Sequence, residues 1–286
     1  MTKLLIFGST GMLGHTLYDY FLTKNDIELY TANRNGFKPN NNKEKNYSIP
    51  DISKLSDDDL KDTIFQIKPS IIINCIGLVK QDNLIKNKLY TIKINSIFPL
   101  MLENICDELN IRLIHFSTDC VFSGIDGNYD ESNNPDARDI YGLSKLMGEC
   151  VNSKALTIRT SIVGYELFNK KNGLLEWFLN SKSEYIFGYV NAFFNGLTTL
   201  EVAKILYNQI LFSNLAGLIH LSSNRISKFD FLCLVNDIYK LNLKIKKSED
   251  FIVDRTLNSS RFINSTNYKI KSWKIMLKEL KKFYEN

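Results

Sequence analysis

A tyrosine and a lysine stand four residues apart, at Tyr141 and Lys145, in a segment whose pattern predicts a helix. Residues at this spacing share one face of a helix, so the phenol and the ammonium can lie side by side. A neighbouring positive charge favours phenolate and lowers the pKa of a tyrosine from its ordinary value of about 10. Tyr141 is therefore predicted to act as a general acid near neutral pH.

A hydroxyl group at the end of a predicted strand supplies the third element of this candidate site. Thr118 and Asp119 follow an apolar run over 112–117 that predicts a β-strand. In open α/β sheets, ligands collect at the carboxyl ends of the strands. A hydroxyl there can polarise a carbonyl, so Thr118 is predicted to steady the oxygen to which Tyr141 gives its proton.

Short apolar runs alternate with amphipathic stretches through the first half of the chain. The runs are too continuously apolar for one face of each strand to be exposed to solvent. They therefore predict buried strands with helices between them. The predicted strands are 3–7, 28–32, 70–74, 112–117 and 155–160. This alternation is typical of a Rossmann-type α/β fold, a doubly wound parallel sheet covered by helices on both faces.

One long helix is predicted over 89–110, with Pro99 inside it. Proline has no backbone N–H and clashes with the preceding turn, so a kink is expected there. Beyond the fifth predicted strand, aromatic-rich loops lead to a helix over about 199–212, a strand over 217–221 and two further helices. This looser pattern predicts a smaller lobe set against the sheet.

The expected domain boundary lies at the end of the fifth strand. Residues 1–160 are predicted to form mainly the nucleotide-binding domain, and residues 161–286 mainly a substrate lobe, with some segments able to return to the sheet. The net charge of +5 comes from a lysine-rich tail. Its lysines are strung along helix-like segments beside apolar residues, which favours a solvated helix face over a nucleic-acid-binding surface.

The first predicted strand runs into a turn with glycines at positions 8, 11 and 14, followed by a helix from about Met12. Such glycines allow a tight turn, let a pyrophosphate approach the amides at the helix N terminus, and permit close packing of the helix on the sheet. The strand–turn–helix setting therefore predicts dinucleotide binding.

The end of the second predicted strand carries Arg34, where a site for NAD usually places a carboxylate. A guanidinium can pair with the 2′-phosphate of NADP, whereas a carboxylate would repel it. We therefore expect NADPH or NADP as the cofactor, with NADH as the alternative.

Cysteine and histidine usage favours neither disulfides nor a metal site. The five cysteines are odd in number and lack any C-x-x-C spacing, which predicts buried, reduced thiols and a cytoplasmic location. The three histidines are too scattered to form a set of metal ligands. No signal-peptide pattern precedes the first strand, and nothing in the sequence indicates a membrane partner.

Taken together, these motifs resemble the dTDP-4-dehydrorhamnose reductase family of the extended short-chain dehydrogenase/reductase superfamily. The most specific block is Ser117-Thr118-Asp119-Cys120-Val121-Phe122-Ser123-Gly124. The remaining blocks, in the family's order, are Gly-x-x-Gly-x-x-Gly from Gly8, Asn74-Cys75-Ile76-Gly77, Asn95, Tyr129-Asp130-Glu131, Pro135, Tyr141-Gly142-x-Ser144-Lys145, Arg159-Thr160-Ser161 and Arg255-x-x-Asn258-Ser259.

The resemblance implies an NADPH-dependent reduction of the 4-keto group of a nucleotide-activated 6-deoxyhexulose. It assigns catalysis to Thr118, Tyr141 and Lys145, with Asn95 supporting a proton relay. The residues it places around the cofactor, besides Tyr141 and Lys145, are Gly8, Thr10, Gly11, Met12, Leu13, Arg34, Asp51, Ile52, Asn74, Cys75, Ile76 and Gly77. Those it places around the nucleotide sugar are Lys80, Asp119, Val121, Phe122, Arg255 and Asn258.

Two departures from the family pattern leave the identity of the sugar substrate undetermined. Ile162 stands where the family commonly has an aromatic residue, and the turn over 75–81 is bulkier than the family's small-residue turn. A UDP-linked 2-acetamido-2,6-dideoxyhexulose is therefore an alternative to a dTDP-linked sugar.

The sequence is also compatible with two other functions, and it does not determine the oligomeric state. One alternative is an epimerase or dehydratase that keeps NAD bound, although Asp119-Cys120 supplies only one of the two acidic residues usual in such dehydratases. The other is a non-catalytic NADP-binding regulatory subunit, against which the intact Thr118, Tyr141 and Lys145 argue. A homodimer is one alternative for the assembly.

Overall fold

The computed structural model describes residues 1–33, 45–48, 51–152, 154–166 and 173–285, with the backbone alone for 45–48. The chain divides into two compact units. The first unit comprises 1–117, 138–158 and 203–218, and the second comprises 118–137, 159–202 and 219–286.

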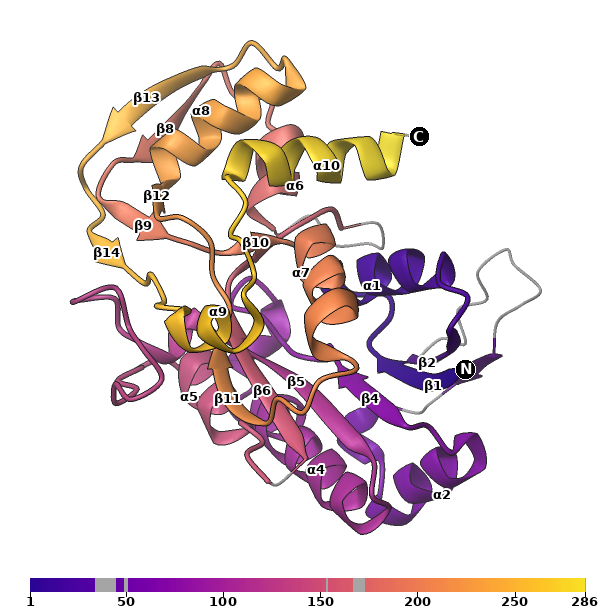
Figure 1. Ribbon diagram of the computed structural model, residues 1–286. Helices are drawn as coiled ribbons and strands as arrows, with labels where there is room; N and C mark the ends of the chain where they lie inside the picture. Colours follow the sequence, from indigo (N-terminus) through magenta and orange to yellow (C-terminus); the bar gives the residue numbers. More distant parts are fainter. Residues whose placement is uncertain (34–44, 49–50, 153, 167–172, 286) are drawn as a thin grey trace. The chain divides into compact units, whose positions relative to one another are not determined.

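Within the described residues, a seven-stranded sheet has the strand order β11-β6-β5-β4-β1-β2-β3 (Figure 1). Its strands are β1 (Thr2–Phe7), β2 (Ile27–Asn33), β3 (Lys45–Ser48), β4 (Ile71–Asn74), β5 (Arg112–Thr118), β6 (Ala155–Thr160) and β11 (Gly217–His220). The pairs β1–β2, β1–β4, β2–β3 and β4–β5 are parallel. The predicted Rossmann-type α/β fold is confirmed.

The order of the strands creates a topological switch point at the edge of the sheet where the strands end. From β1 the chain proceeds to β2 and β3 on one side, and it then returns to β4 and β5 on the other. In the register of the sheet, Phe7 pairs with both Ala32 and Asn74, and Asn74 pairs with His115. The carboxyl ends of four strands therefore meet at this edge, with the topological switch point between β1 and β4.

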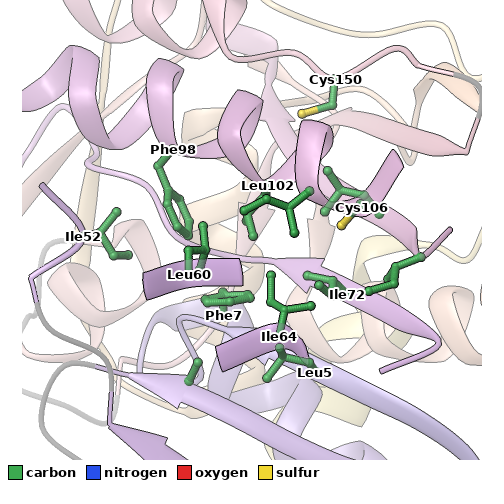
Figure 2. Packing of buried hydrophobic residues seen from close by; sticks show 14 of the residues in the cluster. Leu5, Phe7, Ile52, Leu60, Ile64, Ile72, Phe98, Leu102, Cys106 and Cys150 are labelled. Carbon is green, nitrogen blue, oxygen red and sulfur yellow. The ribbon is translucent and has the colours of Figure 1, made fainter. Parts of the chain in front are cut away.

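Helices cover the strands of the first unit. They are α1 (Met12–Leu22), α2 (Asp57–Ile67), α3 (Lys88–Ile92), α4 (Phe98–Glu108) and α5 (Ile140–Met147), with short 3-10 turns at Ile52–Lys54 and Asn83–Lys86. Alternate residues of a strand point to opposite faces of the sheet. Leu5 and Phe7 of β1 pack in one buried cluster with Leu60 of α2 and Phe98 of α4 (Figure 2). Helix α1 packs on β1 and β2.

The predicted long helix is interrupted before its proline. A π-helical segment, Lys93–Ile97, joins α3 to α4, and Pro99 lies in the first turn of α4. Because proline has no N–H, it cannot donate to the carbonyl of Asn95, which would be its partner in a regular helix. The irregularity expected from Pro99 thus takes the form of a π-helical turn that contains Asn95, a feature frequent at functional sites.

The second unit, in its described part, contains short sheets of order β12-β9-β14, β13-β8 and β10-β7. Their strands are β7 (Ile162–Val163), β8 (Tyr185–Tyr189), β9 (Ala192–Phe194), β10 (Leu197–Thr198), β12 (Ile226–Ser227), β13 (Lys244–Ser248) and β14 (Val253–Asp254). The later helices are α6 (Leu174–Leu179), α7 (Thr199–Ile205), a π-helical segment (Leu206–Ile210), α8 (Lys228–Tyr239), α9 (Ser260–Thr266) and α10 (Trp273–Glu285). The one strand predicted beyond residue 160, over 217–221, corresponds to β11 of the seven-stranded sheet, and the short strands of the second unit were not predicted.

The lysine-rich tail is helical only in part, because Lys244–Ser248 form strand β13, whereas α9 and α10 are helices as predicted. In α10, Trp273, Met276 and Leu280 are buried, whereas Lys274 and Lys278 are exposed. None of the helices in the described part of the chain combines the length and the apolar character needed to cross a bilayer.

All five cysteines are free thiols. Cys106 and Cys150 are buried, but the other three are partly exposed, so the expectation of burial is met at two positions only. Among the described residues, no group of three or more His, Cys, Asp or Glu side chains is placed to hold a metal ion.

Candidate active site

The glycine turn between β1 and α1 has a geometry that side chains would obstruct. Gly8 has a φ of +83°, and a Cβ added to it would lie 2.8 Å from Cγ1 of Ile76. A Cβ added to Gly14 would overlap the carbonyl oxygen of Gly8. Glycine at both positions therefore lets the first turn of α1 lie directly against the end of β1.

The first turn of α1 has the features of an anion site. Gly11 is the N-cap and provides no side-chain cap, and the first turn carries no acidic residue. The amides at this end of the helix, together with its positive dipole end, suit the pyrophosphate of a dinucleotide. Of the residues predicted here, Thr10 and Met12 are partly exposed beside the turn, whereas the side chain of Leu13 is buried.

The other residues predicted to bind the adenosine part of the cofactor lie around the end of β2 and in the segment that follows β3 in the sequence. Asn33, the last residue of β2, is buried and donates to Oγ of Ser9 over 3.5 Å. Arg34 lies outside the described residues. The carboxylate of Asp51 accepts from the amide and hydroxyl of Ser53, at 3.0 and 2.9 Å. Ile52 belongs to the buried cluster of Phe7 (Figure 2).

The loop after β4 crosses the switch point beside the glycine turn. The amide of Cys75 donates to the carbonyl of Phe7 over 3.0 Å, and the amide of Ile76 donates to Oδ1 of Asn74 over 3.0 Å. A Cβ added to Gly77 would lie 3.8 Å from Nζ of Lys145. The predicted cofactor loop and the predicted catalytic lysine are thus neighbours in the first unit.

Asn95 ties this loop to helix α5. Its fully buried side chain accepts from the amide of Leu78 over 2.8 Å and donates to the carbonyl of Leu78 over 3.2 Å. It also donates to Oγ of Ser144 over 3.1 Å. Both amide hydrogens are therefore used in positioning, and the proton relay implied by the family resemblance stays a prediction.

Helix α5 begins at an aspartate that also binds a lysine. Asp139 accepts from the amide of Gly142 over 3.0 Å and from Nζ of Lys80 over 2.7 Å. Nζ of Lys80 lies 5.9 Å from the centre of the Tyr141 ring. Lys80, predicted as a substrate residue, therefore also places a second positive charge beside the phenol.

Lys145 is buried, with only 5 % of its surface exposed. Its Nζ donates to the carbonyl of Phe116 over 2.6 Å and lies 3.4 Å from Nε2 of His115. Burial lowers the pKa of Lys145 to about 8, and the nearby carboxylate of Glu149 opposes that fall. A lysine of this kind exchanges its proton near neutral pH.

In the second unit, Thr118 and Asp119 are linked by hydrogen bonds at the end of β5. Oγ1 of Thr118 donates to Oδ1 of Asp119 and accepts from the amide of Cys120, both over 3.1 Å. Burial raises the pKa of Asp119, while the charges of Lys228 and Arg255 oppose that rise. Burial likewise lowers the pKa of Lys228.

Sequence reasoning missed Lys228. It lies at the first position of α8, after the N-cap Ser227, and its Nζ stands 3.8 Å from the centre of the Phe194 ring. A single lysine at the start of an amphipathic helix resembles any solvated lysine. Only the fold brings it to Asp119 and Arg255.

The remaining predicted substrate residues have distinct surroundings. Val121 and Phe122 are completely buried, and Phe122 stacks on Tyr129 with ring centres 4.1 Å apart. Nε of Arg255 donates to the carbonyl of Phe122 over 2.9 Å. Asn258 instead lines a shallow pocket formed with Asp130, Glu131, Ser132, Ser260 and Arg261, which contains neither Arg255 nor Asp119. The side chains of Val121 and Phe122 thus serve packing, and their contact with substrate stays a prediction.

The fold defines a Rossmann-type α/β protein with a glycine turn at its switch point. A family model described as the RmlD substrate binding domain matches residues 1–251, and the chain belongs to this family. The predicted resemblance to the dTDP-4-dehydrorhamnose reductase family is confirmed, and several of the relatives are named as reductases.

One curated relative is a probable low-salt glycan biosynthesis reductase of Haloferax volcanii, 39% identical over 98 residues. That match covers 32% of this chain and 33% of the relative's length. A dTDP-4-dehydrorhamnose reductase structure from Clostridium acetobutylicum has a TM-score of 0.82 and 19% identity, with 100% of both chains covered. A second, from Bacillus anthracis in complex with NADP, has a TM-score of 0.77 and 21% identity, covering 99% of this chain and 100% of the other. At these identities, the two structures show a shared fold.

Proposed function

We propose that the chain is an NADPH-dependent reductase that converts the 4-keto group of a nucleotide-activated 6-deoxyhexulose to an alcohol. The observation that carries the proposal is the buried Lys145, placed one helical turn after Tyr141 and beside the loop that crosses the switch point. Membership of the family supports the reaction class, and the free thiols are consistent with a cytoplasmic location.

The cofactor proposal rests on the glycine turn, whose uncapped helix end fits a pyrophosphate. A nicotinamide is further supported by the NADP in the Bacillus anthracis structure. When bound, this group supplies the hydride that reduces the carbonyl carbon. The chain's own residues must then bind the substrate, exclude water and deliver a proton to the carbonyl oxygen.

Tyr141 is the proposed proton donor, acting through its phenolic oxygen. The phenolate left behind is stabilised by the ammonium of Lys145 and by the charge of Lys80, whose Nζ lies 5.9 Å from the centre of the Tyr141 ring. Thr118, at the end of β5, is proposed to steady the carbonyl oxygen through its hydroxyl. In the structure this hydroxyl donates to Asp119, and it is proposed to turn towards the substrate when the substrate binds.

Substrate recognition is proposed to involve the cluster of Asp119, Lys228 and Arg255. The two partly exposed cations, Lys228 and Arg255, beside the buried carboxylate of Asp119 leave an excess of positive charge. Such a site suits the diphosphate of a nucleotide sugar, and a guanidinium can contact phosphate through several donors. Asp119 is then available to accept from a sugar hydroxyl.

The proposal is tested by turnover with purified chain. We expect NADPH to be oxidised when a dTDP- or UDP-linked 4-keto-6-deoxy sugar is added, and the two nucleotides to differ in rate. A purified protein whose absorption spectrum shows tightly retained NAD, and which turns over without net oxidation of NADPH, would favour an epimerase or dehydratase instead.

Cofactor choice gives a first prediction, based on Arg34, which follows the second predicted strand in the sequence. NADPH should bind more tightly than NADH, because the guanidinium pairs with the 2′-phosphate. Arg34→Ala should weaken NADPH binding and leave NADH binding unchanged, as measured by fluorescence titration of both cofactors. Equal binding of the two by the unmutated chain would refute the assignment.

Arg255 gives a second prediction. Arg255→Ala should raise KM for the sugar nucleotide by on the order of tenfold or more, because a charge-assisted hydrogen bond is lost, while NADPH affinity stays near its original value. Arg225→Ala is the matched control: Arg225 is more exposed and pairs with Asp254 over 3.0 Å, so KM should change by less than about twofold. A loss confined to NADPH binding would show that Arg255 has been assigned wrongly.

A further inference from the structure

We propose that His115 is a positioning residue for Lys145: Asn74 locks its ring as the neutral Nε2–H tautomer, so that it presents a hydrogen instead of a lone pair to Nζ of Lys145. The proposal deepens the proposed function, since it takes Lys145 as the partner of Tyr141. None of the sequence motifs assigns a role to His115.

The orientation of the Asn74 amide fixes the tautomer. Oδ1 of Asn74 accepts from the amide of Ile76 over 3.0 Å, which places the oxygen on that side and Nδ2 on the other. Nδ2 lies 3.1 Å from Nδ1 of His115 and can only donate. Nδ1 of His115 must therefore accept, and the hydrogen of the neutral ring is carried by Nε2.

The ring stays neutral because of its surroundings. Both Asn74 and His115 are fully buried. Burial and the charge of Lys145 hold the pKa of His115 well below its ordinary value. Its Nε2 lies 3.4 Å from Nζ of Lys145, where the N–H can donate to a neutral amine but opposes an ammonium.

The other groups around Lys145 do not replace this contact. The Phe116 carbonyl accepts from Nζ over 2.6 Å and holds either form of the lysine. Cys75, in the loop after β4, and Glu149 and Cys150, which follow α5, are further titratable groups close to Lys145. Burial raises the pKa of both thiols, which keeps them neutral.

Two further titratable groups, Glu149 and Tyr141, belong to the elements of the site itself. The Glu149 carboxylate accepts from Oγ of Ser117 over 2.7 Å. Tyr141 lies one turn before Lys145 on α5. His115 is therefore the neighbour whose hydrogen position sets how readily Lys145 gives up its proton, and hence how the proton lost by Tyr141 is replaced near neutral pH.

The test is the titration of Lys145 in the full-length chain, followed by NMR of ¹³Cε-labelled lysine, with Lys145→Arg to assign the resonance. Asn74→Asp is the decisive variant. Its carboxylate should accept from Nδ1–H of His115, so that Nε2 turns a lone pair towards the ammonium. The midpoint of the Lys145 titration should then rise by about one pH unit or more.

A double variant distinguishes the effect of the His115 ring on the Lys145 titration from the effect of the new carboxylate charge at position 74. In Asn74→Asp combined with His115→Phe, the carboxylate acts only through space, so most of the rise should disappear. His115→Phe alone should raise the midpoint slightly, because the opposing N–H is gone. His115→Leu replaces it if circular dichroism shows that the phenylalanine variant does not fold.

An unchanged or lowered midpoint in Asn74→Asp would overturn the proposal, as would an equal rise in the double variant. The measurement uses neither substrate nor turnover. A chain that titrates as expected yet fails to reduce any sugar nucleotide would overturn the proposed function alone.

Discussion

Tyr141→Phe is expected to lower turnover by a factor on the order of 10² or more, while NADPH binding stays near its original value. The substitution removes one oxygen and keeps the ring, so the packing of α5 is preserved. Reduction of a carbonyl needs a proton as well as a hydride, and the phenol is the proposed donor. Steady-state kinetics and cofactor titration on the same preparation measure the two effects separately.

Tyr207→Phe is the control for this substitution. Tyr207 also belongs to the first unit, and its hydroxyl donates to Asp26 at an exposed position over 2.9 Å. Its turnover should match that of the unmutated chain. Near-normal turnover in Tyr141→Phe would remove the phenol from the mechanism, whatever the behaviour of Lys145.

Gly14→Ala is expected to have the largest effect on stability and cofactor binding together. The added Cβ would overlap the carbonyl oxygen of Gly8, which is backbone and cannot rotate away. Overpacking of this kind costs about 1–3 kcal/mol or more in the free energy of unfolding. Helix α1 must move from β1 to relieve it, so the pyrophosphate site should also be lost.

Gly11→Ala is the matched control, since its added Cβ would meet the Gly8 carbonyl oxygen at an ordinary distance of 3.5 Å. Urea denaturation of the cofactor-free chain should show a change within about 1 kcal/mol for this variant. Equal destabilisation by the two substitutions would mean that close helix–strand packing is not what requires glycine at position 14.

Local patterns in the sequence predicted six of the seven strands described in the sheet and missed β3. The strand over 155–160 has the predicted bounds, and β1, β2, β4 and β5 differ from theirs by one residue at one or both ends. Continuous apolar runs leave little freedom in such strands, because both faces are buried. The small sheets of the second unit were missed because strands such as β7 and β10 are two residues long and depend on distant partners.

The candidate site could be predicted only where its residues lie close together in the sequence. Tyr141 and Lys145 lie on one helix, and the glycines lie in one turn. By contrast, Asn95 binds Leu78 and Ser144, which are 17 and 49 positions away, and His115 meets Asn74 at a separation of 41. Such contacts follow from strand order and helix packing, which composition and spacing do not specify.

Hydride transfer to the sugar is the most direct test of the central claim. NADPH with deuterium at its reactive C4 position would be incubated with a dTDP- or UDP-linked 4-keto-6-deoxy sugar, and the product examined by NMR. The proposed reductase should place one deuterium on C4 of the sugar for each NADPH oxidised. A product without deuterium at C4, or conversion of the sugar with no consumption of NADPH, would contradict it.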